Sequence, residues 1–192
     1  GYWSGQDVTI EFRPAEAGTG IVFVRGDLAP VFRIPAHVEN RIESPRRTTL
    51  AQGQQTVEMV EHILAALFAL QIDNCEVWTD QPEMPGCDGS SQPFVDALLA
   101  AGRTEQDQPR QQLIVNEHTR VGNEDSWVEA QPAQSKHWSL KYRLDYGPGP
   151  IGRQTIEMEL SADSFQNELA SARTFLLKQE ADWMREQGLG GR

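Results

Sequence analysis

Hydrophobic and polar residues alternate with a period of two in residues 7–16, and a proline ends the strand-like run. This period is typical of a strand with one face toward a core. Apolar residues then recur at helical spacing and predict a helix from about Thr56 to Leu70. A further strand is predicted near Cys75 to Thr79. Strands mixed with helices in this way indicate an α+β organisation.

A second helix is predicted after a loop rich in proline and glycine in residues 82–89. Ser90 or Ser91 is expected to cap its N-terminus, and Pro93 suits its first turn. Gly102 then marks its C-terminal end. The limits of this helix are therefore predicted by local chemistry at both ends.

The strand pattern returns in the second half of the chain, in residues 125–134. A constant shift along the sequence superposes Asp7 on Asp125 and Glu11 on Glu129. The same shift aligns four further pairs, which are Pro14 with Pro132, Ala15 with Ala133, Arg25 with Arg143 and Asp27 with Asp145. This gapless match predicts a duplicated domain. Chance agreement between similar strands is the alternative.

The predicted domain boundaries follow from this duplication. Residues 1–102 form a first α+β domain, which carries Glu61 and His62. The polar segment 103–112 predicts a linker. Residues 113–192 form the N-terminal part of a second α+β domain. The pair Arg47-Thr48 of the first copy recurs as Arg173-Thr174 in the second. We expect the second copy to be incomplete, because few residues follow this pair, whereas the first copy continues through a strand and two helices.

Composition and charge narrow the classes of function. The net charge of −11 disfavours nucleic-acid binding, and 39% hydrophobic residues allow a globular core. The longest apolar run, from Ile63 to Leu70, is shorter than the ~20 residues of a membrane span, and no signal-peptide pattern opens the chain. A cytoplasmic protein is expected. Cys75 and Cys87 lack metal-binding spacing and are expected to be free thiols.

Candidate chemistry lies in the first predicted helix, where Glu61 and His62 are adjacent and follow a polar turn. A carboxylate that can carry a proton, beside an imidazole, is the smallest unit from which metal-assisted hydrolysis can be built. Such a pair also occurs on the solvated edge of many helices. The pair by itself leaves both interpretations open.

Longer motifs surround this pair. They are Val60-Glu61-His62-Ile63-Leu64-Ala65-Ala66-Leu67, Ile72-Asp73-Asn74, the Pro82 to Val95 loop with its Asp-Gly-Ser, and Ser171-Ala172-Arg173-Thr174-Phe175. Together, and in this order, they resemble the UDP-3-O-acyl-N-acetylglucosamine deacetylases of bacterial lipid A biosynthesis. The resemblance implies two duplicated βααβ-type sandwich domains with the active site between them. It also implies zinc-dependent hydrolysis of the N-acetyl group of UDP-3-O-acyl-N-acetylglucosamine, the committed step of that synthesis.

The resemblance implies a zinc ion held by two His and one Asp, with His62 as the first ligand. The other two ligands form a His-x-x-x-Asp pair on a helix of the second domain. The histidines of this chain are His37, His62, His118 and His137, and none has Asp four residues later. The chain as given is therefore expected to lack the remaining metal ligands and to be inactive by itself.

Further roles are implied by the same resemblance. Glu61 takes a proton from the attacking water, and Thr174 helps to hold the tetrahedral oxyanion. Phe175 contacts the sugar ring, and Asp88 supports the site from behind the residues that touch the substrate. The helix expected at residues 178–187 begins an insert that builds the acyl-chain passage.

Trp3 is a departure from the family pattern, which has His at this place. Structural alternatives stand beside two of the implied roles: Thr174 could simply cap or end a helix, and Phe175 could be a core residue. The expected partner is UDP-3-O-acyl-N-acetylglucosamine, with transient membrane-surface contact and without nucleic acid or a membrane span. The alternative function is a non-catalytic relative that binds a nucleotide sugar or a lipid A precursor.

Overall fold

The computed structural model describes residues 1–133 and 138–188. Gln134, at the end of the predicted repeat, and His137 lie outside the described residues. Helices and several sheets are present together, which confirms the predicted α+β class.

The chain divides into two compact units. The first comprises Gly1–Gln108 together with the segment from Gln166 onward, and the second comprises Pro109–Phe165. The segment from Gln166 onward thus groups with the N-terminal part of the chain. The domain boundaries predicted from the sequence rest on an internal duplication. The division into compact units does not test that duplication, so these boundaries stay a prediction.

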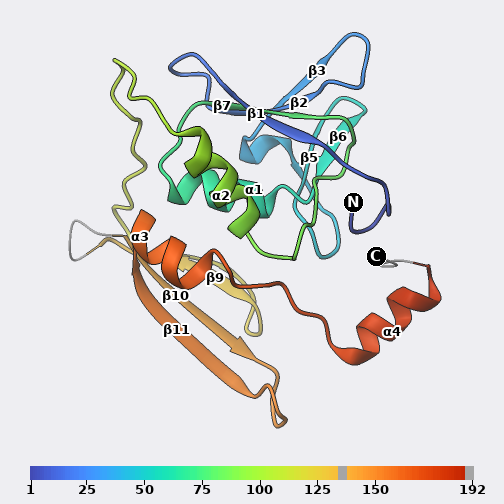
Figure 1. Ribbon diagram of the computed structural model, residues 1–192. Coiled ribbons are helices and arrows are strands. Elements are labelled where there is room, and N and C mark those ends of the chain that lie inside the picture. Colours follow the sequence, from blue (N-terminus) through green and yellow to red (C-terminus); the bar gives the residue numbers. More distant parts are fainter. Residues whose placement is uncertain (134–137, 189–192) are drawn as a thin grey trace. The chain divides into compact units, whose positions relative to one another are not determined.

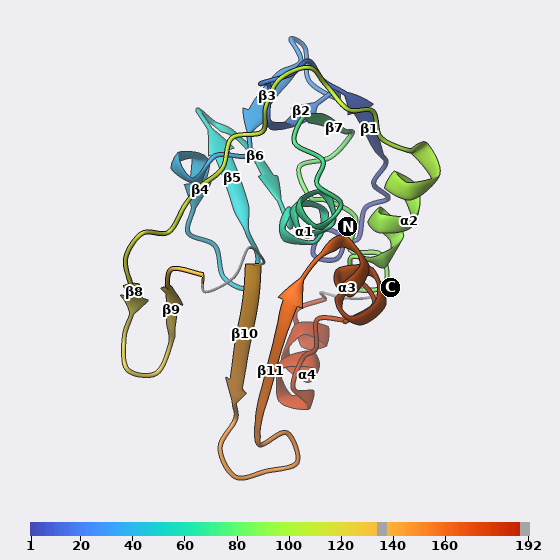
Figure 2. The same ribbon diagram turned by 90° about the vertical axis from the view of Figure 1, so that its left-hand side faces the viewer.

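The larger sheet of the first unit (Figure 1) has the strand order β1-β7-β2-β3, which can be followed in the view of Figure 2. Its strands are β1 (Ile10–Pro14), β2 (Ile21–Arg25), β3 (Phe32–Pro35) and β7 (Cys75–Thr79). β7 pairs antiparallel with β1 and parallel with β2, and β3 pairs antiparallel with β2. Phe23 lies opposite Val77 and Ile34, and these three side chains are fully buried. They form an apolar row on the core side of the sheet, and the strand predicted at Cys75 to Thr79 is confirmed.

A smaller antiparallel sheet has the order β4-β5-β6. It follows a single 3₁₀ turn, η1 (Val38–Asn40), and consists of β4 (Arg41–Ile42), β5 (Thr49–Gln52) and β6 (Gln55–Glu58). Strand β6 corrects the helix predicted to begin at Thr56. Thr56 and Val57 are β-branched, and Val57 is fully buried opposite Leu50 of β5. Pairing with β5 therefore decides the conformation of this short segment.

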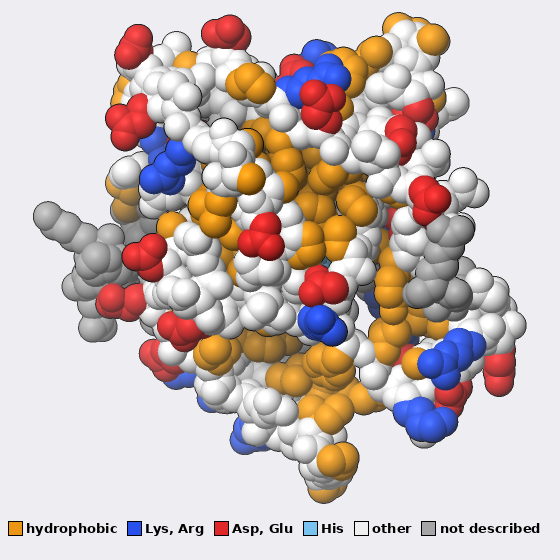
Figure 3. All heavy atoms as spheres, in the orientation of Figure 1, with side chains coloured by type: hydrophobic (Ala, Val, Ile, Leu, Met, Phe, Trp, Pro, Cys, Tyr) orange, Lys and Arg blue, Asp and Glu red, His pale blue; other side chains and the backbone are white. Residues whose placement is uncertain are grey.

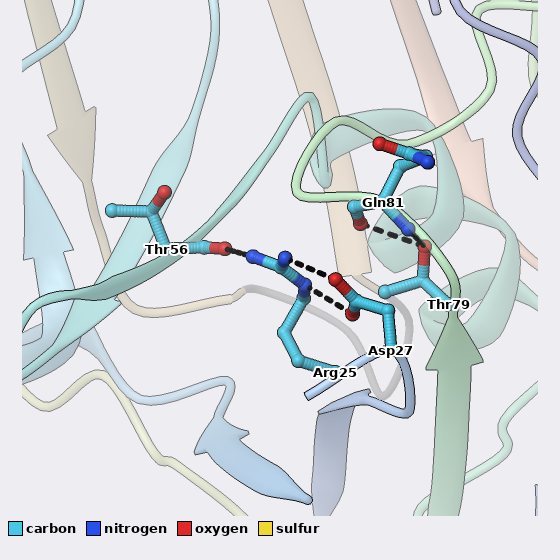
Figure 4. Close-up of polar contacts among 5 residues, drawn as sticks. All are labelled: Arg25, Asp27, Thr56, Thr79 and Gln81. Carbon is cyan, nitrogen blue, oxygen red and sulfur yellow. Dashed lines mark hydrogen bonds and ion pairs between the residues drawn. The ribbon is translucent and has the colours of Figure 1, made fainter. Parts of the chain in front are cut away.

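The buried side chain of Arg25 links the two sheets of the first unit (Figure 4). At the end of β2, the Arg25 guanidinium donates from Nε and Nη2 to the two carboxylate oxygens of Asp27, at 2.8 and 2.6 Å. It also donates to the carbonyl oxygen of Thr56 in β6, at 3.2 Å. The hydrogen bonds from Arg25 lower the pKa of Asp27. In the same view Thr79 exchanges hydrogen bonds with the backbone of Gln81, which fixes the turn after β7.

Two helices lie against one face of the larger sheet (Figures 1 and 2). They are α1 (Glu61–Ala69) and α2 (Gln92–Ala101). Ile63 and Leu67 of α1 and Val95 of α2 are buried in the core. Hydrophobic side chains also gather at the surface over these helices (Figure 3). The predicted ends of α2 are confirmed in position: Ser91 is its N-cap residue, and Gly102, with a φ of 77°, is its C-cap residue. The Ser91 side chain makes no capping hydrogen bond, whereas the Ser90 hydroxyl accepts from the N–H of Gln92 at 3.2 Å.

The second unit contains two separate antiparallel hairpins. One pairs β8 (Thr119–Gly122) with β9 (Trp127–Ala130), and the other pairs β10 (Trp138–Asp145) with β11 (Arg153–Leu160). A short helix, α3 (Ala162–Ser164), follows β11 and leads into a π-helical turn, η2 (Phe165–Leu169). Ser161 caps α3 by accepting a hydrogen bond from the backbone N–H of Ser164.

The predicted duplication is not reproduced at its charged pair. Asp145, which the sequence shift aligns with Asp27, accepts from Nε of Arg153 across the β10–β11 hairpin at 2.7 Å. Arg143, the counterpart of Arg25, is not its hydrogen-bonding partner in the described part of the chain. The cross-strand register favours Arg153 because it lies directly opposite Asp145. The duplication stays a prediction.

A final helix, α4 (Lys178–Glu186), confirms the helix predicted over residues 178–187 to within one residue. The Glu180 carboxylate accepts a hydrogen bond from the N–H of Leu177 at 2.9 Å, which caps the first turn. Among the helices that the structure describes, none combines the length and the apolar character that a bilayer crossing requires.

Candidate functional site

Glu61 and His62 occupy the first turn of α1, and both side chains are half-buried. Helix α1 begins directly after Met59, which has a left-handed φ of 59°. This turn redirects the chain from β6 into α1 and sets the direction in which the helix starts. Both side chains thus lie at the edge of the core, and the roles of Glu61 and His62 stay predictions.

The Glu61 carboxylate is held by the start of β5. Its Oε2 atom accepts a hydrogen bond from the backbone N–H of Thr48 at 2.9 Å. The Thr48 carbonyl in turn accepts from the N–H of Val60, at 3.4 Å. The first turn of α1 and the residue before β5 are thus joined in both directions. Within the described residues, the structure records no hydrogen bond to the second carboxylate oxygen, Oε1.

Asp88 and Thr174, far apart in sequence, lie in two segments that hydrogen-bond through their backbones. The N–H of Thr174 donates to the carbonyl of Gly89 at 3.0 Å, and the N–H of Ser91 donates to the carbonyl of Ala170, also at 3.0 Å. Gly89 has a φ of 84°, which an L side chain rarely adopts. Backbone hydrogen bonds therefore join the Asp-Gly-Ser loop to the segment that carries Thr174.

The Asp88 carboxylate turns back onto its own loop. Its Oδ1 atom accepts from the Ser90 hydroxyl at 2.6 Å and from the Ser90 N–H at 3.1 Å, and Oδ2 forms an ion pair with Arg173 at 3.4 Å. These hydrogen bonds, with the Arg173 charge, lower the pKa of Asp88. The supporting role of Asp88 stays a prediction.

Phe175 is half exposed, so the alternative of a core side chain is wrong. Beyond it, Glu180 in α4 forms an ion pair with Arg46 at 2.8 Å. Arg46, Gln179, Glu180 and Trp183 line an open pocket of about 330 Å³. The segment after Thr174 therefore runs from the Asp88 loop to the residues that precede β5. In the described part of the chain, no hydrogen bond or ion pair joins Thr174 to Glu61 or His62.

One predicted metal ligand, His62, lies among the described residues. His62 offers an imidazole nitrogen, which is a suitable zinc ligand. However, residues 1–133 and 138–188 contain no group of three or more His, Cys, Asp or Glu side chains arranged to hold a metal ion. Cys75 and Cys87 are free thiols as predicted, and burial raises the pKa of Cys75 to about 11. The described residues therefore do not by themselves form a zinc site, and His62 stays the predicted ligand among them.

Glu83, Arg47 and Glu58 were not predicted as site residues from the sequence. The buried Glu83 carboxylate accepts from the N–H groups of Trp3 and Ser4 at 2.6 and 2.7 Å. The Arg47 guanidinium lies over the Trp3 ring, 5.1 Å from its centroid, and forms an ion pair with Glu58. The only sequence signal for this group was Trp3 itself, as a departure from the family pattern.

These features define an α+β protein with an acid–imidazole pair at the start of a helix that packs into the core. Comparison with known proteins identifies its family. The family model LpxC, UDP-3-O-acyl N-acetylglycosamine deacetylase, matches residues 1–192. The chain belongs to this family, which confirms the resemblance found in the sequence.

Individual relatives agree with the family assignment. The chain is 38% identical to the UDP-3-O-acyl-N-acetylglucosamine deacetylase of Citrifermentans bemidjiense over 189 residues, covering 98% of this chain and 61% of the relative. It is 37% identical to the enzyme of that name from Actinobacillus pleuropneumoniae serotype 3, covering 98% and 62%. It is 36% identical to the bifunctional enzyme LpxC/FabZ of Chlorobaculum tepidum, covering 98% and 40%. The chain thus spans about 61% of the length of the first of these relatives.

Proposed function

We propose that the complete protein hydrolyses the N-acetyl group of UDP-3-O-acyl-N-acetylglucosamine with the help of zinc, as a step of lipid A biosynthesis. The reaction consumes one water, breaks the amide C–N bond, and releases acetate and a free amine. The observation that carries the proposal is the Glu61-His62 pair, whose carboxylate is held at 2.9 Å by the Thr48 N–H inside a family match over the whole chain.

His62 would be one zinc ligand, and the others would come from parts of the protein that this chain does not contain. When bound, zinc supplies a Lewis acid and lowers the pKa of a water molecule toward ~7. Glu61 then serves as the general base, because its Oε2 is fixed by Thr48 while Oε1 is available to accept the water proton.

Two residues of the C-terminal segment complete the proposal. The Thr174 hydroxyl donates a hydrogen bond to the oxyanion, a role that a positioned hydroxyl can fill. The half-exposed Phe175 ring offers an apolar face to the sugar. The segment that bears both is anchored to the loop of Asp88 through Gly89, so the Asp88 loop would keep them in place.

The setting proposed for this reaction is the cytoplasm, with transient contact at a membrane surface where the acylated substrate is available. Nucleic acid is not a proposed partner, because the net charge of −11 repels a phosphate backbone.

Substitution of Glu61 tests the general base. In the complete protein, Glu61→Ala should lower kcat by about 10²–10⁴-fold, the range typical of a general base, while zinc content stays unchanged. Acetate release and metal analysis measure the two quantities. Glu157→Ala, which removes a carboxylate that is 64% exposed in β11, is the control and should keep wild-type turnover. Unchanged turnover in Glu61→Ala would assign the base to another residue.

Substitution of His62 tests the metal ligand. His62→Ala should lose zinc affinity, since one of few ligands is removed, and should lose turnover with it. Isothermal titration with zinc measures the affinity. Wild-type zinc affinity in this variant would refute the ligand assignment. A complete protein that binds the UDP-sugar but neither binds zinc nor releases acetate would instead be the non-catalytic relative.

A further inference from the structure

A chain of contacts runs from residues 3 and 4 to the Glu61 carboxylate. Its last contact is the Thr48 N–H, which donates to Glu61 Oε2 at 2.9 Å. A backbone donor can fix a side chain only as well as its own loop is fixed. The residues that hold the loop before Thr48 therefore affect how firmly Glu61 is placed.

Arg47, immediately before Thr48, is held from two sides. Its guanidinium Nε lies 2.8 Å from a carboxylate oxygen of Glu58 in β6, in an ion pair that lacks hydrogen-bond geometry, and both side chains are about one quarter exposed. Its Cζ atom lies 5.1 Å from the centroid of the Trp3 ring, in range of a cation–π interaction. The partial burial of this arrangement strengthens both interactions relative to a fully solvated pair.

Trp3 itself is positioned by a buried acid. The Glu83 side chain is part of a residue only 3% exposed, and its two carboxylate oxygens accept from the N–H groups of Trp3 and Ser4. Glu83 also lies beside Glu58, since the two residues form an isolated parallel bridge. Glu83, which holds Trp3, and Glu58, which pairs with Arg47, are thus neighbours across this bridge.

We propose that Glu83, Trp3 and Arg47 are positioning residues that fix the Thr48 N–H against the Glu61 carboxylate. The proposal rests on the proposed function, in which Glu61 is the general base. None of the three residues is assigned contact with the substrate. They act through the backbone of Thr48, so disturbing them should affect the chemical step more than substrate binding.

Kinetics of the complete zinc-loaded enzyme provide the first test. Trp3→Leu should lower kcat about three- to tenfold, the size expected for loss of a partly buried cation–π contact, and should leave KM within about twofold. Trp3→Phe keeps an aromatic ring over Arg47 and should restore most of kcat. Trp127→Leu is the matched control, because Trp127 lies under Arg120 at 4.3 Å in the second unit, and it should keep wild-type kcat.

A double-mutant cycle separates positioning from a general loss of structure. If Trp3 acts through Glu61, then Trp3→Leu should lower kcat by less than about twofold in the Glu61→Ala background. If Trp3→Leu instead lowers kcat by the same factor in the Glu61→Ala background as in the wild type, the positioning role would be overturned. Arg47→Lys provides a second entry point if Trp3→Leu folds poorly, because lysine keeps the charge opposite Glu58 but not the planar stack on Trp3.

Hydrogen exchange supplies a readout that does not depend on turnover. The Thr48 amide should exchange about three- to tenfold faster in Trp3→Leu and in Arg47→Lys, and at the wild-type rate in Trp127→Leu. Unchanged Thr48 exchange in the first two variants would overturn the proposal. Wild-type turnover in Glu61→Ala would refute the proposed function alone, because Thr48 exchange would still show whether the three residues hold this loop.

Discussion

Glu83 shows how one residue connects stability with the candidate site. Burial alone would raise the pKa of its carboxyl, but the hydrogen bonds from Ser4 and Trp3 favour the ionised form, and the pKa is lowered. A buried carboxylate is tolerated when its oxygens are hydrogen-bonded in this way. The N-terminal turn is therefore held to the rest of the first unit by an ionised acid.

The pH dependence of stability tests this role. At pH 7, Glu83→Gln should lower the free energy of unfolding by about 1–3 kcal/mol, because the amide cannot accept both N–H groups as a carboxylate does. The folded pKa is depressed, so the advantage of the wild type is full above the unfolded pKa and is lost as the pH falls through the folded pKa. Urea unfolding between about pH 7 and pH 3 measures the difference. An advantage that grows in acid would contradict this assignment.

At the scale of secondary structure, the meeting of two loops places Thr174. The segment after η2 pairs with the Asp88 loop at Gly89, which adopts a φ of 84°. A Cβ atom at Gly89 would meet the Thr174 backbone oxygen at 3.9 Å, which is ordinary contact. Backbone conformation rather than space is therefore what restricts this position to glycine.

Gly89→Ala should lower the free energy of unfolding by about 1–2 kcal/mol, the cost of forcing an L residue into the left-handed region. Gly89→Asn should cost less, because Asn tolerates this region better. Chemical denaturation measures both. Gly149→Ala is the control, since Gly149 lacks a positive φ and an added Cβ would meet open space, and it should change stability by less than about 0.5 kcal/mol. Equal effects of Gly89→Ala and Gly149→Ala would rule out this explanation.

At the scale of the whole molecule, the β10–β11 hairpin of the second unit is amphipathic. One face carries Trp138, Leu140, Tyr142 and Leu144, opposite Leu160, Met158, Ile156 and Gln154. The other face alternates charged and small polar residues. Tyr142 and Ile156 are directly opposite each other and are 56% and 41% exposed. Soluble proteins seldom leave such a continuous apolar face open, and the relatives of this chain are longer.

We therefore expect this face to be packed in a protein of the relatives' length. Tyr142→Ser should then lower the free energy of unfolding of that protein by about 1–3 kcal/mol, through lost burial of apolar area. Lys141→Ser, on the polar face of the same strand, should change it by less than about 0.5 kcal/mol. Thermal or urea unfolding compares the two. A neutral Tyr142→Ser would show that the face is solvated.

The sequence by itself determined the features that depend on nearby residues. The strand at Cys75–Thr79 and the ends of α2 at Ser91 and Gly102 follow from periodicity and from the residue types preferred at helix ends, which act over a few residues. The position of α4 followed from the family resemblance. The Glu61-His62 pair and the family were also readable from the chain, because motifs of fixed spacing identify them.

Only the tertiary structure decided the contacts that join distant segments. Residues 55–58 became a strand because β5 was available to pair with them, which local helical spacing could not reveal. The hold of Thr48 on Glu61, of Glu83 on Trp3, and of Gly89 on Thr174 depends on how the strands and loops are brought together. The physical reason is range: propensity and capping act between neighbours in sequence, whereas these hydrogen bonds form only after the fold places their donors and acceptors within about 3 Å.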